Sequence, residues 1–160
     1  NINAHLTESG KLVALALGDK LSFVKFDAAF RSPMYRTEET ISCILQKNPF
    51  PVAVTVDPRI RERDYGYLEG ETHKTQPEFN MRWHIDYDAD RLKMESLDSL
   101  FSRVGSFMRF LKENYKGKNV LVVTHSGTIR AFRYLAGEGR DKTDLTDMGV
   151  DNSACITLPL

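Results

Sequence analysis

Cysteine is scarce in this chain, and three kinds of sequence are missing from it. Its 160 residues include only Cys43 and Cys155, which form no C-x-x-C pair, so we expect two reduced, mostly buried thiols. No apolar run approaches the roughly 20 residues that a membrane helix needs, and no signal peptide is visible. The histidines show no metal-ligand spacing. We therefore expect a cytoplasmic protein that binds neither a membrane nor a metal.

An excess of charge of either sign is also absent. Lys and Arg together number 22, as do Asp and Glu, so the net charge is zero and gives no reason to expect nucleic-acid binding. Hydrophobic residues make up 41% and charged residues 28%, as in an ordinary soluble protein. This length and composition predict a single domain over residues 1–160 with a substantial core. The sequence leaves open whether two copies form a homodimer.

Strand-like and helix-like segments alternate along the chain. Short apolar segments predict strands at residues 26–30, 52–56, 119–124 and 154–158. Amphipathic or capped segments predict helices from Thr7 to Leu21, from Pro33 to Gln46, from Ser96 to Tyr115, and from just after His125 to near Gly137. The alternation predicts an α/β fold in which a mostly parallel central sheet lies between two layers of helices.

Three patches able to carry chemistry follow predicted strands, and the carboxyl ends of parallel strands meet at one edge of a sheet. Arg31 and Arg36 follow the first strand, and their guanidinium groups could bind a phosphate. Glu62 lies among arginines in the loop 59–70, where it could be a salt-bridge partner or a general acid. His125 stands where a helix begins, and its first amides favour an anion. Each patch by itself also fits a purely structural role.

Five elements of the chain, in the right order, resemble the histidine phosphatase superfamily, whose best known branch is cofactor-dependent phosphoglycerate mutase. They are Leu6-Thr7-Glu8-Ser9-Gly10 (L-T-x-x-G), Ser32 to Thr40 (S-P-x-x-R-x-x-x-T), Arg61 to Gly70 (R-E-R-x-x-G-x-x-E-G), Glu95-Ser96 (the end of G-G-E-S) and Thr124 to Gly127 ([ST]-H-[SG]-G). One such match would be weak, but five in register cover nearly the whole chain. The resemblance implies a three-layer, phosphoglycerate mutase-like fold.

The resemblance also implies a reaction, namely phosphoryl transfer through a phosphohistidine. It implies that Arg36, His125 and Ser126 bind the phosphate of a small phosphorylated metabolite and that His125 takes part in catalysis. Glu62 would protonate the leaving group and then activate water or a second acceptor. No cofactor is expected, and no metal, because arginine and imidazole supply the positive field.

Three further residues are secondary candidates. Arg61 and Arg63 could bind phosphate or form solvent-facing salt bridges. Tyr65 could line the pocket or simply pack.

One family element is missing from these residues. The family's first strand ends in R-H-G-E/T, whose histidine is the nucleophile, and nothing before Leu6 resembles it. His5 is no substitute, because Leu6-Thr7 follows it and no arginine precedes it. We expect the natural protein to carry this element and the 160 residues alone to be inactive. The alternative is a phosphate-binding homologue that lacks turnover.

The stretch between Glu62 and His125 is short and lacks the long insertion typical of the mutase branch. It therefore favours a phosphomonoester hydrolase, with phosphoglycerate mutase as the alternative. Within this stretch, we expect a lid at about 71–95. Its large side chains are Phe79, Met81, Trp83 and Tyr87. Ordinary packing under a loop is the other interpretation of these four.

Overall fold

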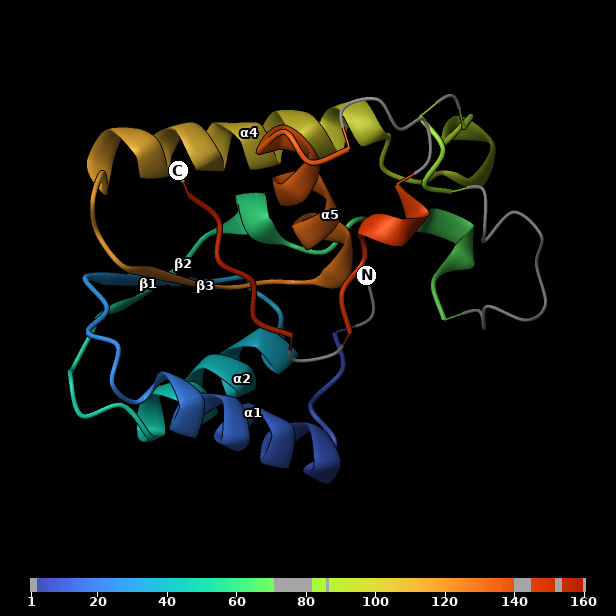
Figure 1. Ribbon diagram of the computed structural model, residues 1–160. Coiled ribbons are helices and arrows are strands. Elements are labelled where there is room, and N and C mark those ends of the chain that lie inside the picture. Colours follow the sequence, from blue (N-terminus) through green and yellow to red (C-terminus); the bar gives the residue numbers. More distant parts are fainter. Residues whose placement is uncertain (1–2, 71–81, 86, 140–144, 152–153, 160) are drawn as a thin grey trace.

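The computed structural model describes residues 3–70, 82–85, 87–139, 145–151 and 154–159 (Figure 1). Its helices and strands are α1 (Glu8–Leu21), β1 (Ala28–Arg31), α2 (Tyr35–Gln46), β2 (Val54–Val56), α4 (Leu97–Asn114), β3 (Val120–Val123) and α5 (Ser126–Leu135). Short 3₁₀ turns within the described residues lie at Pro58–Ile60, Gly66–Leu68, Asp90–Leu92 and Thr146–Met148.

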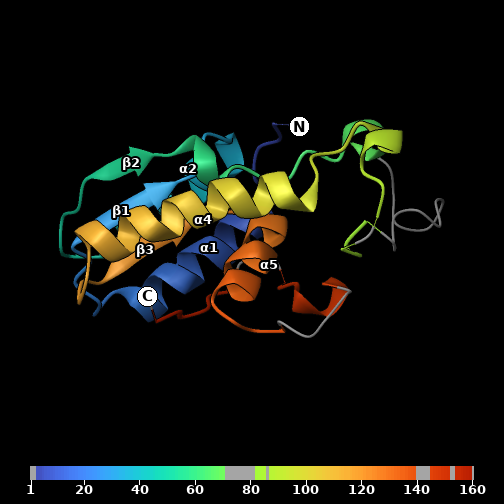
Figure 2. The ribbon, with the colours of Figure 1, turned by 90° about the horizontal axis from the view of Figure 1, so that it is seen from above.

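The strands form a parallel sheet in the order β2-β1-β3. Ala29 of β1 lies opposite Val54 on one side and Leu121 on the other. Figure 2 shows the three strands side by side, with β1 between its two neighbours. All three strands therefore end at the same edge of the sheet.

Helices cover both faces of this sheet (Figure 1). The side chains of a strand alternate between the two faces. Phe30 accordingly belongs to a large core with residues of α4 and α5, including Phe107. The rings of Phe30 and Phe107 pack edge to face, with their centroids 5.4 Å apart. Ala29 faces a smaller core with residues of α2, including Ile41 and Ile44. The predicted three-layer α/β/α sandwich is confirmed.

Most predicted helix ends are also confirmed. The Thr7 hydroxyl caps α1 by accepting the Gly10 N–H at 3.1 Å. The Ser96 hydroxyl caps α4 by accepting the Ser99 N–H at 3.1 Å. In contrast, α2 begins at Tyr35, two residues after the Pro33 that we expected to open it.

The strand expected at residues 154–158 is wrong. These residues carry no strand, and most of their side chains are exposed. A strand needs the backbone of a partner to satisfy its amides and carbonyls. Among the described residues, β3 has only β1 as a neighbour. Apolar composition therefore did not suffice to make a strand here.

Cys43 is half-buried and Cys155 is exposed, so the expectation of buried thiols is wrong for Cys155; both are free cysteines. Within the described ranges, no helix is long and apolar enough to cross a membrane.

Candidate active site

Backbone hydrogen bonds tie the ends of the three strands together. The Ser32 N–H, just after β1, donates to the carbonyl of Val123 at 3.1 Å. The Asp57 N–H, just after β2, donates to the carbonyl of Arg31 at 2.9 Å. The segments that follow these strands therefore start close together, as the parallel sheet predicts.

His125 is the N-cap residue of α5 and is 6% exposed. Its Nδ1 accepts the Nε–H of Arg36 at 3.2 Å, and its Nε2 lies 2.8 Å from the hydroxyl oxygen of Ser32. Burial lowers the pKa of His125 to about 3, helped by the positive charges of Arg36 and Arg103. The imidazole in this site is therefore neutral at ordinary pH.

Glu62 reaches the first turn of α5. Its Oε1 accepts the N–H of Arg63 at 2.8 Å, and its Oε2 accepts the N–H of Gly127 at 3.5 Å. Burial raises the pKa of Glu62, while these two amides and the charges of Arg36 and Arg130 work in the opposite direction. A carboxyl group with a raised pKa can hold a proton to higher pH.

The absence of a side chain at Gly127 allows the Glu62 carboxylate to come this close to α5. A Cβ on Gly127 would overlap Glu62 Oε1 and would lie 3.0 Å from both the Tyr65 hydroxyl and the Trp83 ring. The structure thus brings together Arg36, Glu62 and His125, the three residues that the sequence singled out first.

Sequence reasoning missed the residue that holds the Glu62 loop in place. Arg103, on α4, donates to the backbone carbonyls of Arg59 (2.7 Å), Arg61 (2.8 Å) and Glu62 (3.3 Å). The same guanidinium meets both carboxylate oxygens of Glu95, at 2.6 and 2.8 Å. A single buried ion pair therefore fixes the backbone on either side of Glu62.

We expect Glu95→Gln to lower the free energy of unfolding by about 3–5 kcal/mol, the usual cost of leaving one member of a buried ion pair without its partner. The Glu95 side chain is 4% exposed and that of Arg103 is 13% exposed. Urea unfolding of this chain measures the loss. Glu138→Gln is the matched control, because Glu138 also meets an arginine Nε, at 2.7 Å, but at the surface. It should cost about 0–1 kcal/mol. Equal losses in both variants would contradict the conclusion that Glu95 and Arg103 form a stabilising buried ion pair.

The two secondary arginine candidates are engaged by the protein itself. Arg61 forms an ion pair with Glu95 at 3.4 Å. Arg63 is buried at 1% exposure and donates to the carbonyls of Glu95 (2.8 Å) and Arg82 (2.5 Å). Burial lowers the pKa of Arg63 to about 10. A solvent-facing salt bridge, one of the two roles that the sequence left open for Arg63, is therefore wrong, because its guanidinium lies inside the fold.

Tyr65 and Trp83 lie beside Glu62. Their rings meet edge-on with centroids 6.2 Å apart, and burial raises the pKa of the Tyr65 hydroxyl. Trp83 is 1% exposed, and the guanidinium groups of Arg63 and Arg130 lie over its ring at 4.9 and 4.7 Å. Trp83 thus packs in the core.

Of the other large side chains expected in the lid, Tyr87 packs against the small cluster of Leu68, Ala89 and Met94. Phe79 and Met81 lie outside the described residues.

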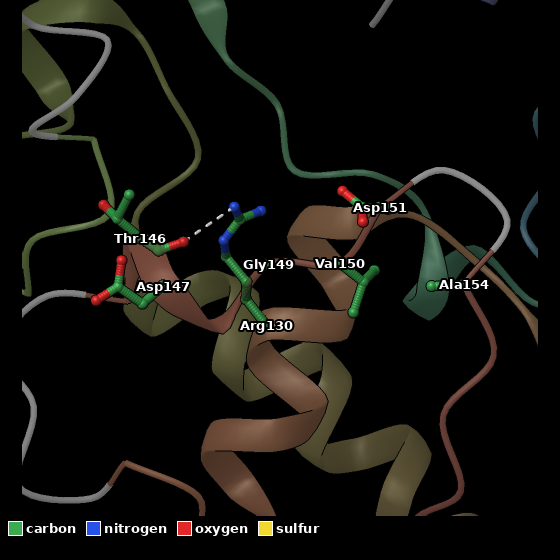
Figure 3. A pocket seen from close by; sticks show the side chains of 7 residues that line it. All are labelled: Arg130, Thr146, Asp147, Gly149, Val150, Asp151 and Ala154. Atoms are coloured by element: carbon green, nitrogen blue, oxygen red, sulfur yellow. Dashed lines mark hydrogen bonds between the residues drawn. The ribbon is translucent and has the colours of Figure 1, made fainter.

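Ser126 adjoins a surface cavity of about 400 Å³. Its hydroxyl accepts from Arg130 at 3.0 Å and donates to the carbonyl of Val150 at 3.4 Å. The cavity is lined by Arg130, Thr146, Asp147, Gly149, Val150, Asp151 and Ala154 (Figure 3). Arg36, Glu62 and His125 are not part of this lining, so the cavity is a neighbour of the site and not its centre.

Comparisons with known proteins agree with this geometry. The family model of the histidine phosphatase superfamily (branch 1) matches residues 1–159. A 2,3-bisphosphoglycerate-dependent phosphoglycerate mutase 2 of Gloeobacter violaceus is 36% identical over 135 residues, 79% of this chain and 62% of the relative. Phosphoserine phosphatase 1 of Hydrogenobacter thermophilus is 31% identical, over 96% of this chain and 74% of its own.

A solved structure supports the fold. A phosphoglycerate mutase from Bacillus anthracis superposes with a TM-score of 0.76 at 25% identity, covering 94% of this chain and 74% of that one. The chain belongs to the histidine phosphatase superfamily.

Proposed function

We propose that the protein is a phosphomonoester hydrolase that works through a phosphohistidine and acts on a small phosphorylated metabolite. The observation that carries the proposal is the meeting of Arg36, Glu62 and His125 at the N-terminus of α5. The chain spans 62% of the length of its mutase relative from Gloeobacter violaceus, so the activity of the whole protein is part of this proposal. We expect the nucleophilic histidine to come from an R-H-G element outside these residues.

The charge distribution suits a phosphoryl group. A transferring phosphoryl carries its charge on the equatorial oxygens, and fixed positive groups stabilise it there. Arg36 supplies a guanidinium, and His125 supplies a ring nitrogen beside it. We place Ser126 at the edge of this site, where its hydroxyl is engaged by Arg130. Arg61 and Arg63 act by holding the Glu62 loop, since both contact Glu95.

Glu62 is the proposed general acid. Its raised pKa favours the protonated form that a leaving alkoxide needs. Tyr65 lies beside it and would line the side from which the leaving group departs, whereas Trp83 packs behind it in the core. We keep a lid at about 71–95 as part of the proposal, with Trp83 as its buried anchor.

The proposed reaction uses no metal and no cofactor, and we assign it to the cytoplasm. Among the residues that the structure describes, no three His, Cys, Asp or Glu side chains are grouped so as to hold a metal ion.

A phosphoglycerate mutase is the second candidate, because relatives with that name match over most of this chain. The two reactions differ only in the acceptor of the second step, which is water in the hydrolase and a phosphoglycerate in the mutase. An inactive phosphate-binding protein is the third candidate, and a homodimer is compatible with each of the three.

Assays with p-nitrophenyl phosphate and with phosphoglycerates test the proposal. We expect negligible turnover by the 160 residues alone and clear hydrolysis by a protein in which the R-H-G element precedes them. Transfer between phosphoglycerates without release of phosphate would favour the mutase. Strong activity of the short chain would mean that another residue, such as His125, is the nucleophile.

A further inference from the structure

The hydrogen bonds of His125 define which ring nitrogen carries the proton. A neutral imidazole has one donor and one acceptor nitrogen. The Nε–H of Arg36 can only donate, so Nδ1 of His125 must present its lone pair to it. Nε2 therefore carries the proton and donates to the hydroxyl oxygen of Ser32, a fully buried side chain at the end of β1.

A flipped imidazole ring, or a ring with a proton on Nδ1, does not fit these contacts. Turning the imidazole by half a turn would put ring carbons against both Ser32 and Arg36. Adding a proton to Nδ1 would set two N–H groups against each other at the 3.2 Å contact. In the site as it stands, Arg36 and a proton thus compete for Nδ1.

We propose that Ser32 and Arg36 hold His125 as the neutral Nε2–H form when no anion is bound, and that a bound phosphate draws Arg36 away from Nδ1 so that His125 takes up one proton from solvent. The protonated Nδ1 then donates to a phosphate oxygen, while the guanidinium binds the same anion. The inference rests on the proposed function, because it needs an anion at Arg36.

The surrounding charges explain why the binding of an anion favours proton uptake by His125. Arg36 from α2 and Arg103 from α4 both lower the pKa of His125. Glu62 lies at the first turn of α5 and interacts with Arg36. A dianion beside Arg36 offsets the two positive charges and would be repelled by a lone pair on Nδ1. Proton uptake removes that repulsion and adds a charge-assisted hydrogen bond.

The first experiment reads the tautomer directly in the 160-residue chain. Nitrogen-15 NMR of labelled histidine distinguishes a ring nitrogen with a proton from one with a lone pair, and His125→Asn identifies the signals of His125. We expect Nε2 protonated and Nδ1 unprotonated from about pH 5 to pH 8, a range well above the pKa of about 3. A protonated Nδ1 in the anion-free protein would overturn the inference.

The second experiment uses sulfate, which has the shape and charge of a phosphate dianion but does not itself titrate in this range. If one proton is taken up, the Kd for sulfate should rise about tenfold per pH unit between the pKa of His125 in the free protein, about 3, and its higher pKa in the complex, and should level off above the latter. The NMR signals should show both ring nitrogens protonated once sulfate or inorganic phosphate is bound. Binding with a flat pH profile and a neutral ring would overturn this inference alone. No binding of either anion would overturn the proposed phosphate site together with the proton uptake, whereas the tautomer would still be decided by the first experiment.

A pair of matched variants tests the competition for Nδ1. Arg36→Met removes the competing donor and should raise the pKa of His125 by about 1–3 pH units. Arg31→Met removes an equal charge at the end of β1, but Arg31 contacts Glu38 and the Ser32 carbonyl. It should leave the pKa of His125 unchanged. Equal shifts in both variants, with native amide spectra, would show that Arg36 acts only as a general positive charge.

Discussion

In a protein that carries the R-H-G element, Glu62→Gln should lower kcat on alkyl phosphates by about 10²–10⁴-fold, the usual contribution of general acid catalysis. Glutamine keeps the size of the side chain, and its single amide oxygen can still accept from one of the two amides, those of Arg63 and Gly127, that Glu62 accepts on its two oxygens, but it cannot deliver a proton. An alkoxide is a poor leaving group and needs that proton. Steady-state kinetics on a sugar or glycerate phosphate measure the effect.

A second substrate separates acid catalysis from a structural role. The p-nitrophenolate ion leaves without help, so Glu62→Gln should lower kcat on p-nitrophenyl phosphate by clearly less. The pH profile adds a further check, because Glu62 is active below its raised pKa and loses its proton as the pH rises through it. The variant should lack this decline on alkyl phosphates. Equal losses on both substrates would argue that Glu62 only holds its neighbours in place. Glu113→Gln, on the exposed side of α4, is the control.

The convergence of Arg36 and His125 could be predicted from the sequence because it follows from topology. Both residues come just after strands with strong apolar patterns, and parallel strands end together. Glu62 follows in the same way from β2, although five residues separate it from the end of that strand. Local periodicity and strand order thus sufficed for the outline of the site.

The supporting contacts could not be predicted, because they join segments far apart in the chain. Arg103 resembles any polar residue of an amphipathic helix, and nothing nearby in sequence indicates that it binds carbonyls 41 to 44 positions earlier. Ser32 was visible only as a motif residue, without its contact to His125 93 positions later. A charged loop residue is usually exposed, but Arg63 is buried, because Trp83 and two backbone carbonyls surround its guanidinium.

The error at residues 154–158 has the same origin. An apolar pattern indicates that a segment can be a strand, but pairing depends on which backbone lies next to it. The strand predicted at residues 119–124 has such a neighbour, because β3 pairs with β1 and has packing partners on both of its faces. Leu121 and Val123 face one core while Val120 and Val122 pack against the other.

Arg36→Ala is expected to lower kcat/KM on alkyl and aryl phosphates alike, by about 10²–10³-fold, the usual cost of removing one fixed donor to transition-state charge. Both substrates have the same charged phosphoryl group in the transition state, so the nature of the leaving group should not change the loss. This equal loss is the opposite signature to that of Glu62→Gln, and the two variants together assign the two roles.

The control for this variant is Arg31→Ala. Arg31 is the last residue of β1, the strand that precedes Arg36, but its guanidinium meets Glu38 at 3.2 Å and the Ser32 carbonyl at 3.0 Å. It should keep activity near that of the unsubstituted protein. Removing Arg36 also frees Nδ1 of His125 and raises the pKa of that ring, so that the ring carries more of the positive charge at low pH. The loss caused by Arg36→Ala should therefore grow as the pH rises. A loss confined to alkyl phosphates, or one matched by Arg31→Ala, would contradict a phosphate-binding role for Arg36.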